Sequence, residues 1–184
     1  MKFTDHNRVL IVDDEDSNRS LYRFILRDAG KGAATLEFDV TLCAQGEDAI
    51  EAVRTAIADG APYQVGFLDL VMPPGIDGVE TAERIRAIDP LINLVIVTGH
   101  AEFPIEDIAD RVPPVDKLLY QQKPIQPAEM LQLARALSHK WASENYSELL
   151  LQAAEQSSDS VVITDPEGVI EYVNSTFEQV TGYA

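Results

Sequence analysis

The chain has 184 residues, of which 46% are hydrophobic and 24% are charged, the balance of a globular protein with a sizeable core. Fourteen lysines and arginines stand against 31 aspartates and glutamates, giving a net charge of -17. Direct binding to nucleic acid or to an anionic membrane is therefore not expected. A single cysteine, Cys43, excludes an internal disulfide framework, and no apolar run is long enough for a signal peptide or a membrane span. We expect a cytoplasmic protein.

The first 140 residues alternate short apolar runs with amphipathic segments. Five runs have the pattern of strands: Arg8–Val12, Glu37–Cys43, Val65–Leu70, Leu91–Thr98 and Leu118–Gln121. Helical spacing is found between them, over Ser17–Ala29, Gly46–Ala58, Gly78–Ile88 and around Ile105–Arg111. The apolar face expected for the first helix consists of Leu21, Phe24, Ile25 and Ala29.

This alternation predicts an α/β fold with helices on both faces of a parallel sheet. We expect the doubly wound, flavodoxin-like arrangement of five strands in the order 2-1-3-4-5. The near-continuous apolar runs of the first, third and fourth strands fit central positions. Ligands of such sheets bind at the carboxyl ends of the central strands, so polar residues there are the first candidates for a functional site.

A long helix is predicted to open at Pro127. Its apolar stripe is interrupted at residues 143–145, which suits a terminal helix that runs into a linker at least as well as the seam of a dimer. Beyond it, Val161–Thr164 and Val169–Val173 have the pattern of a β-hairpin, and Ser175 begins a capping box that opens another helix.

We therefore divide the chain into three parts. The first domain covers residues 1–140, a helical linker covers residues 141–156, and an α+β unit covers residues 157–184. The last part is too short to hold a core of its own, so we expect it to be the truncated start of a larger domain.

Five polar residues are expected at the carboxyl edge of the sheet. Asp13 and Asp14 follow the first strand, Asp69 ends the third, Thr98 ends the fourth, and Lys123 follows the fifth. Crowded carboxylates repel one another unless a cation joins them, and Mg²⁺ prefers carboxylate, carbonyl and water oxygens. A carboxylate beside Mg²⁺ and an ammonium group can attack phosphorus and form an aspartyl phosphate.

These residues resemble the receiver domains of two-component response regulators, over about residues 7–140. The resemblance implies that Asp13 and Asp14 are a metal-binding acid pair. It also implies that Asp69 is both a metal ligand and the phospho-accepting aspartate. The backbone carbonyl of Val71, two residues later, is implied as a further ligand of Mg²⁺.

The resemblance extends to the fourth and fifth strands. It implies that Lys123, followed by a cis peptide to Pro124, is a catalytic lysine. Thr98 matches the hydroxyl that serves in catalysis and as a switch, and Tyr120 matches the aromatic switch position. An aromatic residue on a short strand is also often a core residue, and Glu15, beside the acid pair, is expected to be solvated.

Two loops depart from the family pattern. The loop Pro73-Pro74-Gly75 is one residue longer than the commonest form, and Val112-Pro113-Pro114 interrupts the segment before the fifth strand. Val71 is apolar where many relatives are polar, and His100 lies two residues past Thr98. If these two positions flank the path of the hydrolytic water, the acyl phosphate is expected to be long-lived.

The end of the chain resembles the start of a PAS sensory domain, through Ala153–Asp165, Gly168–Asn174, Phe177 and Thr181–Tyr183. Receiver–PAS chains of this kind often continue into a histidine kinase or a cyclic-dinucleotide enzyme. A homodimer through the face of the fourth helix, fifth strand and fifth helix, or through the linker helix, is a further expectation.

The sequence thus predicts a phosphorelay receiver rather than an enzyme. A histidine kinase or a phosphotransfer protein would pass a phosphoryl group to Asp69, and the change would reach the chain's own PAS and output region. One alternative is a Mg²⁺-dependent phosphohydrolase with an aspartyl nucleophile, although Val71 stands where such enzymes usually carry a second acid. Another is an interaction module that does not depend on phosphorylation.

Overall fold

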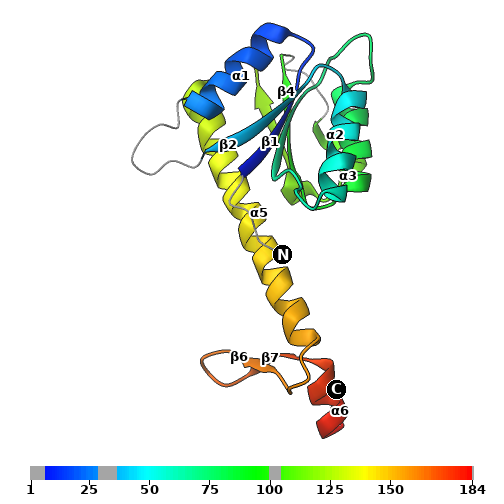
Figure 1. Cartoon of the computed structure of the whole chain (residues 1–184), viewed down its shortest axis with the longest axis vertical. Helices are drawn as coiled ribbons and strands as arrows, with labels where there is room; N and C mark the ends of the chain where they lie inside the picture. The colour runs from blue at the N-terminus through cyan, green and yellow to red at the C-terminus, as the bar shows by residue number, and fades with distance from the viewer. Residues whose placement is uncertain (1–6, 29–36, 100–104, 184) are drawn as a thin grey trace. The chain divides into compact units, whose positions relative to one another are not determined.

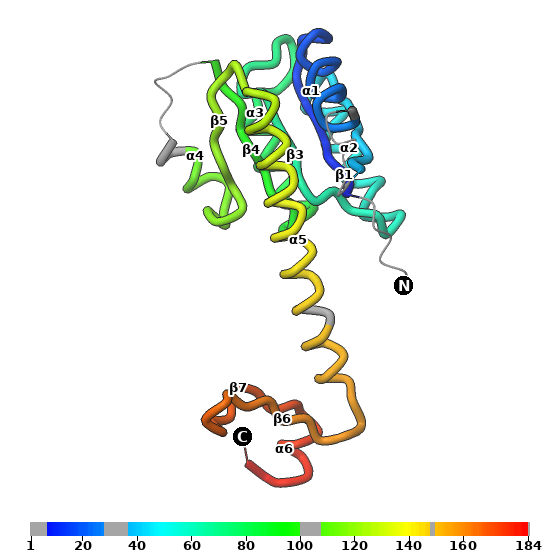
Figure 2. The backbone as a smooth tube through the Cα atoms, turned by 90° about the vertical axis from the view of Figure 1, so that its left-hand side faces the viewer, coloured from blue at the N-terminus to red at the C-terminus, as the bar shows by residue number. Residues whose placement is uncertain are grey.

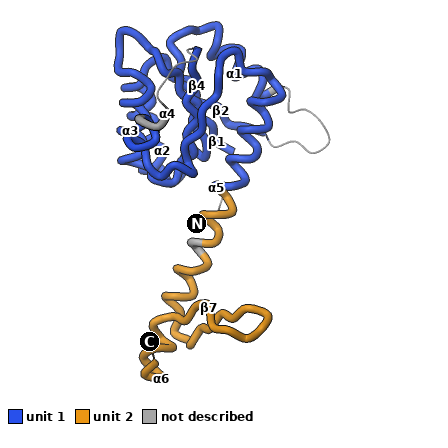
Figure 3. Tube along the Cα trace, turned by 180° about the vertical axis from the view of Figure 1, so that it is seen from behind, with its two compact units in different colours: residues 1–141 blue, residues 142–184 orange. Residues whose placement is uncertain are grey.

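A computed structural model of the chain describes residues 7–28, 37–99 and 105–183 (Figure 1). The chain forms two compact units, residues 1–141 and residues 142–184 (Figure 3). Within the described residues, no helix combines the length and the apolar character that a membrane span requires.

The first unit is built on a five-stranded parallel sheet in the order β2-β1-β3-β4-β5. The strands are β1 (Asn7–Val12), β2 (Phe38–Cys43), β3 (Val65–Asp69), β4 (Asn93–Thr98) and β5 (Leu118–Gln122). Figure 2 shows β5, β4, β3 and β1 side by side. The helices are α1 (Asp16–Asp28), α2 (Gly46–Ala58), α3 (Gly78–Ile88), α4 (Ile105–Arg111) and α5 (Pro127–Glu155), with a 3₁₀ turn η1 (Val115–Lys117) before β5. The predicted fold class and strand order are confirmed.

Helices cover both faces of the sheet because the strand side chains alternate between two apolar cores. Leu10 and Val12 of β1 pack in a core with α2, α3 and α4. Val9 and Ile11 of the same strand pack in a second core with α1 and α5, on the opposite face (Figure 1). Burial on both faces explains why the central strands are nearly continuous apolar runs.

Helix α1 turns a different face to the sheet from the one expected. Its buried apolar residues are Tyr22, Ile25 and Leu26. Leu21 and Phe24, which were predicted to belong to the core face, are 48% and 62% exposed. Ala29 lies outside the described residues. Two overlapping stripes of apolar residues run along this helix, and their spacing alone does not tell which one faces the sheet.

Strand β4 begins at Asn93, two residues later than predicted. The carboxylate of Asp89 accepts hydrogen bonds from the backbone N–H groups of Leu91 (2.9 Å) and Ile92 (3.2 Å). These bonds hold both residues in a turn after α3, because a short acidic side chain can replace a backbone partner.

The second unit contains the expected hairpin and helix. Strands β6 (Val162–Thr164) and β7 (Ile170–Val173) pair antiparallel, and α6 (Ser175–Thr181) follows. The predicted capping box at Ser175 is wrong by one residue: Asn174 is the N-cap of α6, because its side chain accepts a hydrogen bond from the N–H of Phe177, and Ser175 is the first residue of the helix.

Gly78 allows α3 to approach the end of β3 closely. Its N–H donates to the carbonyl of Leu70 at 2.9 Å, and a Cβ atom added at Gly78 would lie 2.1 Å from the backbone oxygen of Asp69. Only glycine therefore fits between α3 and the strand end that carries Asp69.

We expect Gly78→Ala to lower the free energy of unfolding by about 2 kcal/mol or more, because the strand end or the helix must move. Urea unfolding followed by circular dichroism measures this. Gly99→Ala is the matched control, since nothing lies within 4 Å of a Cβ atom added there. Equal losses in the two variants would contradict the packing argument.

Candidate functional site

The carboxyl ends of four neighbouring strands bring the predicted site residues to one edge of the sheet. Asp13 directly follows β1, and Asp69 is the last residue of β3. Thr98 ends β4, and Lys123 directly follows β5. The parallel register aligns these ends, with Asp69 opposite Val97 on the adjacent strand.

The ammonium group of Lys123 lies between two carboxylates. Its Nζ is 2.8 Å from Oδ2 of Asp13 and 2.7 Å from Oδ2 of Asp69. Asp13 is 1% exposed and Asp69 is 8% exposed, so both hydrogen bonds are charge-assisted contacts at a largely desolvated site. The structure thus brings together three of the residues predicted from the strand ends.

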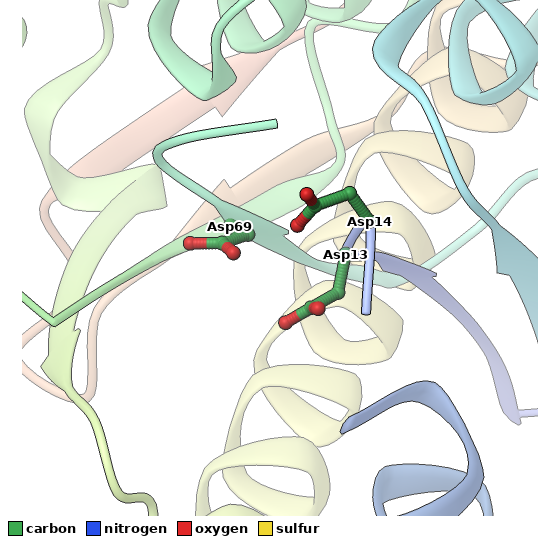
Figure 4. A group of neighbouring side chains, drawn as sticks. All are labelled: Asp13, Asp14 and Asp69. Carbon is green, nitrogen blue, oxygen red and sulfur yellow. The ribbon is translucent and has the colours of Figure 1, made fainter. Parts of the chain in front are cut away.

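Asp14 completes a cluster of three acids. One carboxylate oxygen from each of Asp13, Asp14 and Asp69 lies within 4.8 Å of the others (Figure 4). Asp13 and Asp69 are buried, whereas Asp14 is half-buried. Oxygen ligands at this spacing are the donors that Mg²⁺ takes, and they fit the metal that the sequence suggested.

The pKa values of Asp69 and Lys123 are both raised, but for different reasons. Burial raises the pKa of Asp69 above the ordinary carboxyl value, although the hydrogen bond and the charge of Lys123 lower it in part. Burial also acts to lower the pKa of Lys123, but the hydrogen bonds and charges of Asp13 and Asp69 outweigh it, so that pKa is raised. Lys123 therefore remains a cation. A further positive charge near Asp69 would stabilise the ionised form of its carboxylate.

Residues from the start of α1, which the sequence argument did not single out, hold Asp13 in place. Nδ2 of Asn18 lies 3.1 and 3.2 Å from the two carboxylate oxygens of Asp13. Nη1 of Arg19 donates to the backbone carbonyl of Asp13 at 2.6 Å. Glu15, expected to be solvated, is exposed, but its backbone N–H donates to Asp13 at 2.9 Å. The sequence signal that could have revealed this role is the pair of polar residues, Asn18 and Arg19, in the first helical turn after Asp13 and Asp14.

The loop after β3 is fastened to the start of α2. The side chain of Gln45 donates to the carbonyl of Pro73 at 3.4 Å and accepts from the N–H of Gly75 at 3.1 Å. The Pro73–Pro74 peptide is cis. Val71, in the same loop, directs its backbone N–H to Asp69 Oδ1 at 3.5 Å, and its side chain is 49% exposed.

The predicted switch residues lie on β4 and β5. The backbone carbonyl of Thr98 accepts from the N–H of Lys123 at 2.8 Å, which ties the two strand ends together. Tyr120 is partly buried against the core shared with α2 and α3, and burial raises its pKa. The Lys123–Pro124 peptide is cis, as the resemblance implied. His100 lies outside the described residues.

Comparison with known proteins identifies the class. The family model for the response regulator receiver domain matches residues 9–135, and a PAS domain model matches residues 148–184. The chain therefore belongs to the response regulator receiver family, and a PAS-family segment follows the receiver.

Relatives and solved structures agree with this assignment. The rice two-component response regulator ORR41 is 37% identical over 92 residues, covering 50% of this chain and 65% of that protein. The C4-dicarboxylate transport transcriptional regulatory protein DctD of Rhizobium meliloti is 27% identical over 172 residues, covering 94% of this chain and 34% of its own length. This chain thus spans less than two thirds of either relative. A CheY-like receiver structure from Methanospirillum hungatei covers 76% of this chain and 98% of its own, with a TM-score of 0.61 at 19% identity, and it shares the fold.

Proposed function

We propose that the chain is a phosphorelay receiver that accepts a phosphoryl group on Asp69. The donor is the phosphohistidine of a histidine kinase or of a phosphotransfer protein. An oxygen of the Asp69 carboxylate bonds to phosphorus while the bond between phosphorus and the imidazole nitrogen breaks. The imidazole leaves with that electron pair and takes up a proton. The product is an acyl phosphate, and the domain turns over no outside substrate.

The Lys123 ammonium between the carboxylates of Asp13 and Asp69 is the observation that carries this proposal. A cation 2.7 Å from the acceptor oxygen is in place to neutralise the charge of an incoming phosphoryl group. Asp13, Asp14, Asp69 and the backbone carbonyl of Val71 are the proposed ligands of Mg²⁺. When bound, Mg²⁺ supplies further charge neutralisation for the transferring group.

Thr98 and Tyr120 are the proposed switch. A phosphoryl group on Asp69 is a local change of charge that the Thr98 hydroxyl can meet by moving toward it, with Tyr120 turning further inward. The surface of α4 and β5 would change with them. The contact between the Thr98 carbonyl and the Lys123 N–H supports this coupling, because it ties the switch strand to the site lysine.

We propose that α5 carries the change toward the PAS segment. This helix begins at Pro127, four residues after Lys123, and continues without a break to Glu155. Ile125, between them, is buried in the core that α1 and α5 share with the sheet, so a shift of Lys123 is transmitted to packed side chains.

Within the second unit, the end of α5 is fastened by Asn174, which is fully buried. Its Nδ2 donates to the carbonyls of Ala154 and Asp159, each at 2.9 Å. Its Oδ1 accepts from the N–H groups of Val161 (2.9 Å) and Phe177 (3.1 Å). One side chain thus joins the last turn of α5 to the residues just before β6 and to α6, which supports transmission from the end of this helix into the PAS segment.

We propose a receiver over residues 1–140, a helical connection over residues 141–156 and a PAS segment over residues 157–184. A homodimer and a cytoplasmic location stay predictions. Exposed Tyr146, Leu150 and Leu151 on α5 support a contact surface on that helix.

Incubation with phosphoramidate and Mg²⁺, followed by intact mass spectrometry, tests the acceptor role. We expect one added phosphoryl group on the wild type and none on Asp69→Asn, which has no nucleophilic carboxylate. Asp77→Asn is the matched control, because this acid caps α3 at the same edge and should leave the reaction intact. Steady release of phosphate would support the phosphohydrolase, and an unmodified wild type would support the inert interaction module.

The relay is tested with Asn174→Asp, which keeps the acceptor for Val161 and Phe177 but loses both donors to Ala154 and Asp159. In the wild type, phosphorylation should change the hydrogen exchange of residues 158–177. In the variant that change should disappear, while the exchange of residues 65–99 still responds.

Tyr172→Phe serves as the control for the relay, since it removes only the hydrogen bond from the Tyr172 hydroxyl to Glu155 (2.6 Å). Its response should match that of the wild type. An unchanged response in Asn174→Asp would contradict transmission through the end of α5.

A further inference from the structure

Asn18 lies in the first turn of α1, five residues after Asp13, and its amide spans two carboxylates. Its Nδ2 is 3.1 Å from Oδ1 and 3.2 Å from Oδ2 of Asp13, and 3.3 Å from Oε2 of Glu15. Ionised carboxylates only accept hydrogen bonds, so the NH₂ end of the amide must face them. One neutral group therefore reaches both oxygens of the innermost acid of the site.

The other donors to the Asp13 carboxylate each contact one of its two oxygens. The backbone N–H of Glu15 reaches Oδ1 at 2.9 Å, and Lys123 reaches Oδ2 at 2.8 Å. Lys123 shares its ammonium with Asp69, so it can follow either carboxylate. A donor that contacts both oxygens resists rotation of the Asp13 carboxylate about its Cβ–Cγ bond. It also lowers the cost of burying that charge.

The neutrality of Asn18 suits a metal site. With all groups ionised, the carboxylates of Asp13, Asp14 and Asp69 and the ammonium of Lys123 leave two negative charges, which a divalent cation balances. A lysine or arginine at position 18, in contact with the Asp13 carboxylate, would remove part of that charge, whereas Arg19 on the same helix donates to the backbone carbonyl of Asp13 and pairs with Asp16. An amide orients Asp13 and leaves the charge of the site available to a cation.

We propose that Asn18 is a positioning residue of the acceptor site. It acts through Asp13, which anchors Lys123, and through Lys123 it holds the Asp69 carboxylate in the arrangement that phosphoryl transfer needs. This inference rests on the proposed acceptor function of Asp69. It adds a residue of α1 to a site that the strand ends alone do not complete.

The test is the rate at which phosphoramidate modifies the chain at saturating Mg²⁺, measured by intact mass. Asn18→Leu keeps a similar side-chain volume and loses the amide, and it should slow the reaction about tenfold, the worth of roughly one hydrogen bond to a charged group. Asn18→Asp keeps the shape but replaces the donors with acceptors, and it should also be slow. Ser20→Ala, at an exposed position of the same helix, should react at the wild-type rate.

Circular dichroism and urea unfolding establish that each variant is folded before its rate is compared. A wild-type rate in folded Asn18→Leu, with the wild type itself phosphorylated, overturns the role of Asn18 and leaves the acceptor function standing. A normal rate in Asn18→Asp overturns it too, because shape rather than hydrogen-bond donation would then matter. A wild type that takes up no phosphoryl group overturns the acceptor function and this inference together.

Discussion

The ammonium of Lys123 between the carboxylates of Asp13 and Asp69 is the contact on which the rest of the site depends. Its partners lie 110 and 54 residues away in the chain, so only the folded sheet can assemble it. Without this cation, three acids whose carboxylate oxygens lie within 4.8 Å of one another would repel, and the pKa of Asp69, which burial raises, would lose the lowering effect of Lys123. The fold therefore gathers three carboxylates and one ammonium group at a site whose remaining negative charge favours a further cation.

The register of the parallel sheet brings the site residues together. Four parallel strands end at the same edge, and the residues at those ends meet regardless of their distance in sequence. The glycine at position 78 lets α3 approach the backbone of Asp69, and Gln45 fastens the loop that follows β3. These contacts restrain the acceptor strand from the side opposite α1.

The sequence was sufficient for the architecture and for the strand-end residues. Apolar runs that alternate with helical stripes specify a parallel sheet, and the position of Asp69 after such a run places it at the carboxyl edge. Contacts that depend on which side of a helix faces the sheet could not be predicted from these patterns. Leu21 and Phe24 have the same helical spacing as Tyr22 and Leu26, so spacing alone could not show that Tyr22 and Leu26 are the buried pair. Asn18 was missed for the same reason, since its role depends on which side of α1 faces the acids.

Binding of Mg²⁺ at the three acids is the most direct test of the account, and calorimetric titration of the wild type and of Asp14→Asn measures it. Asp16→Asn, at an exposed acid outside the cluster, controls for the loss of one charge. The account predicts saturable binding at one site, weakened about tenfold or more in Asp14→Asn and unchanged in Asp16→Asn. Absence of saturable binding in the wild type, or equal affinity in all three proteins, would contradict it.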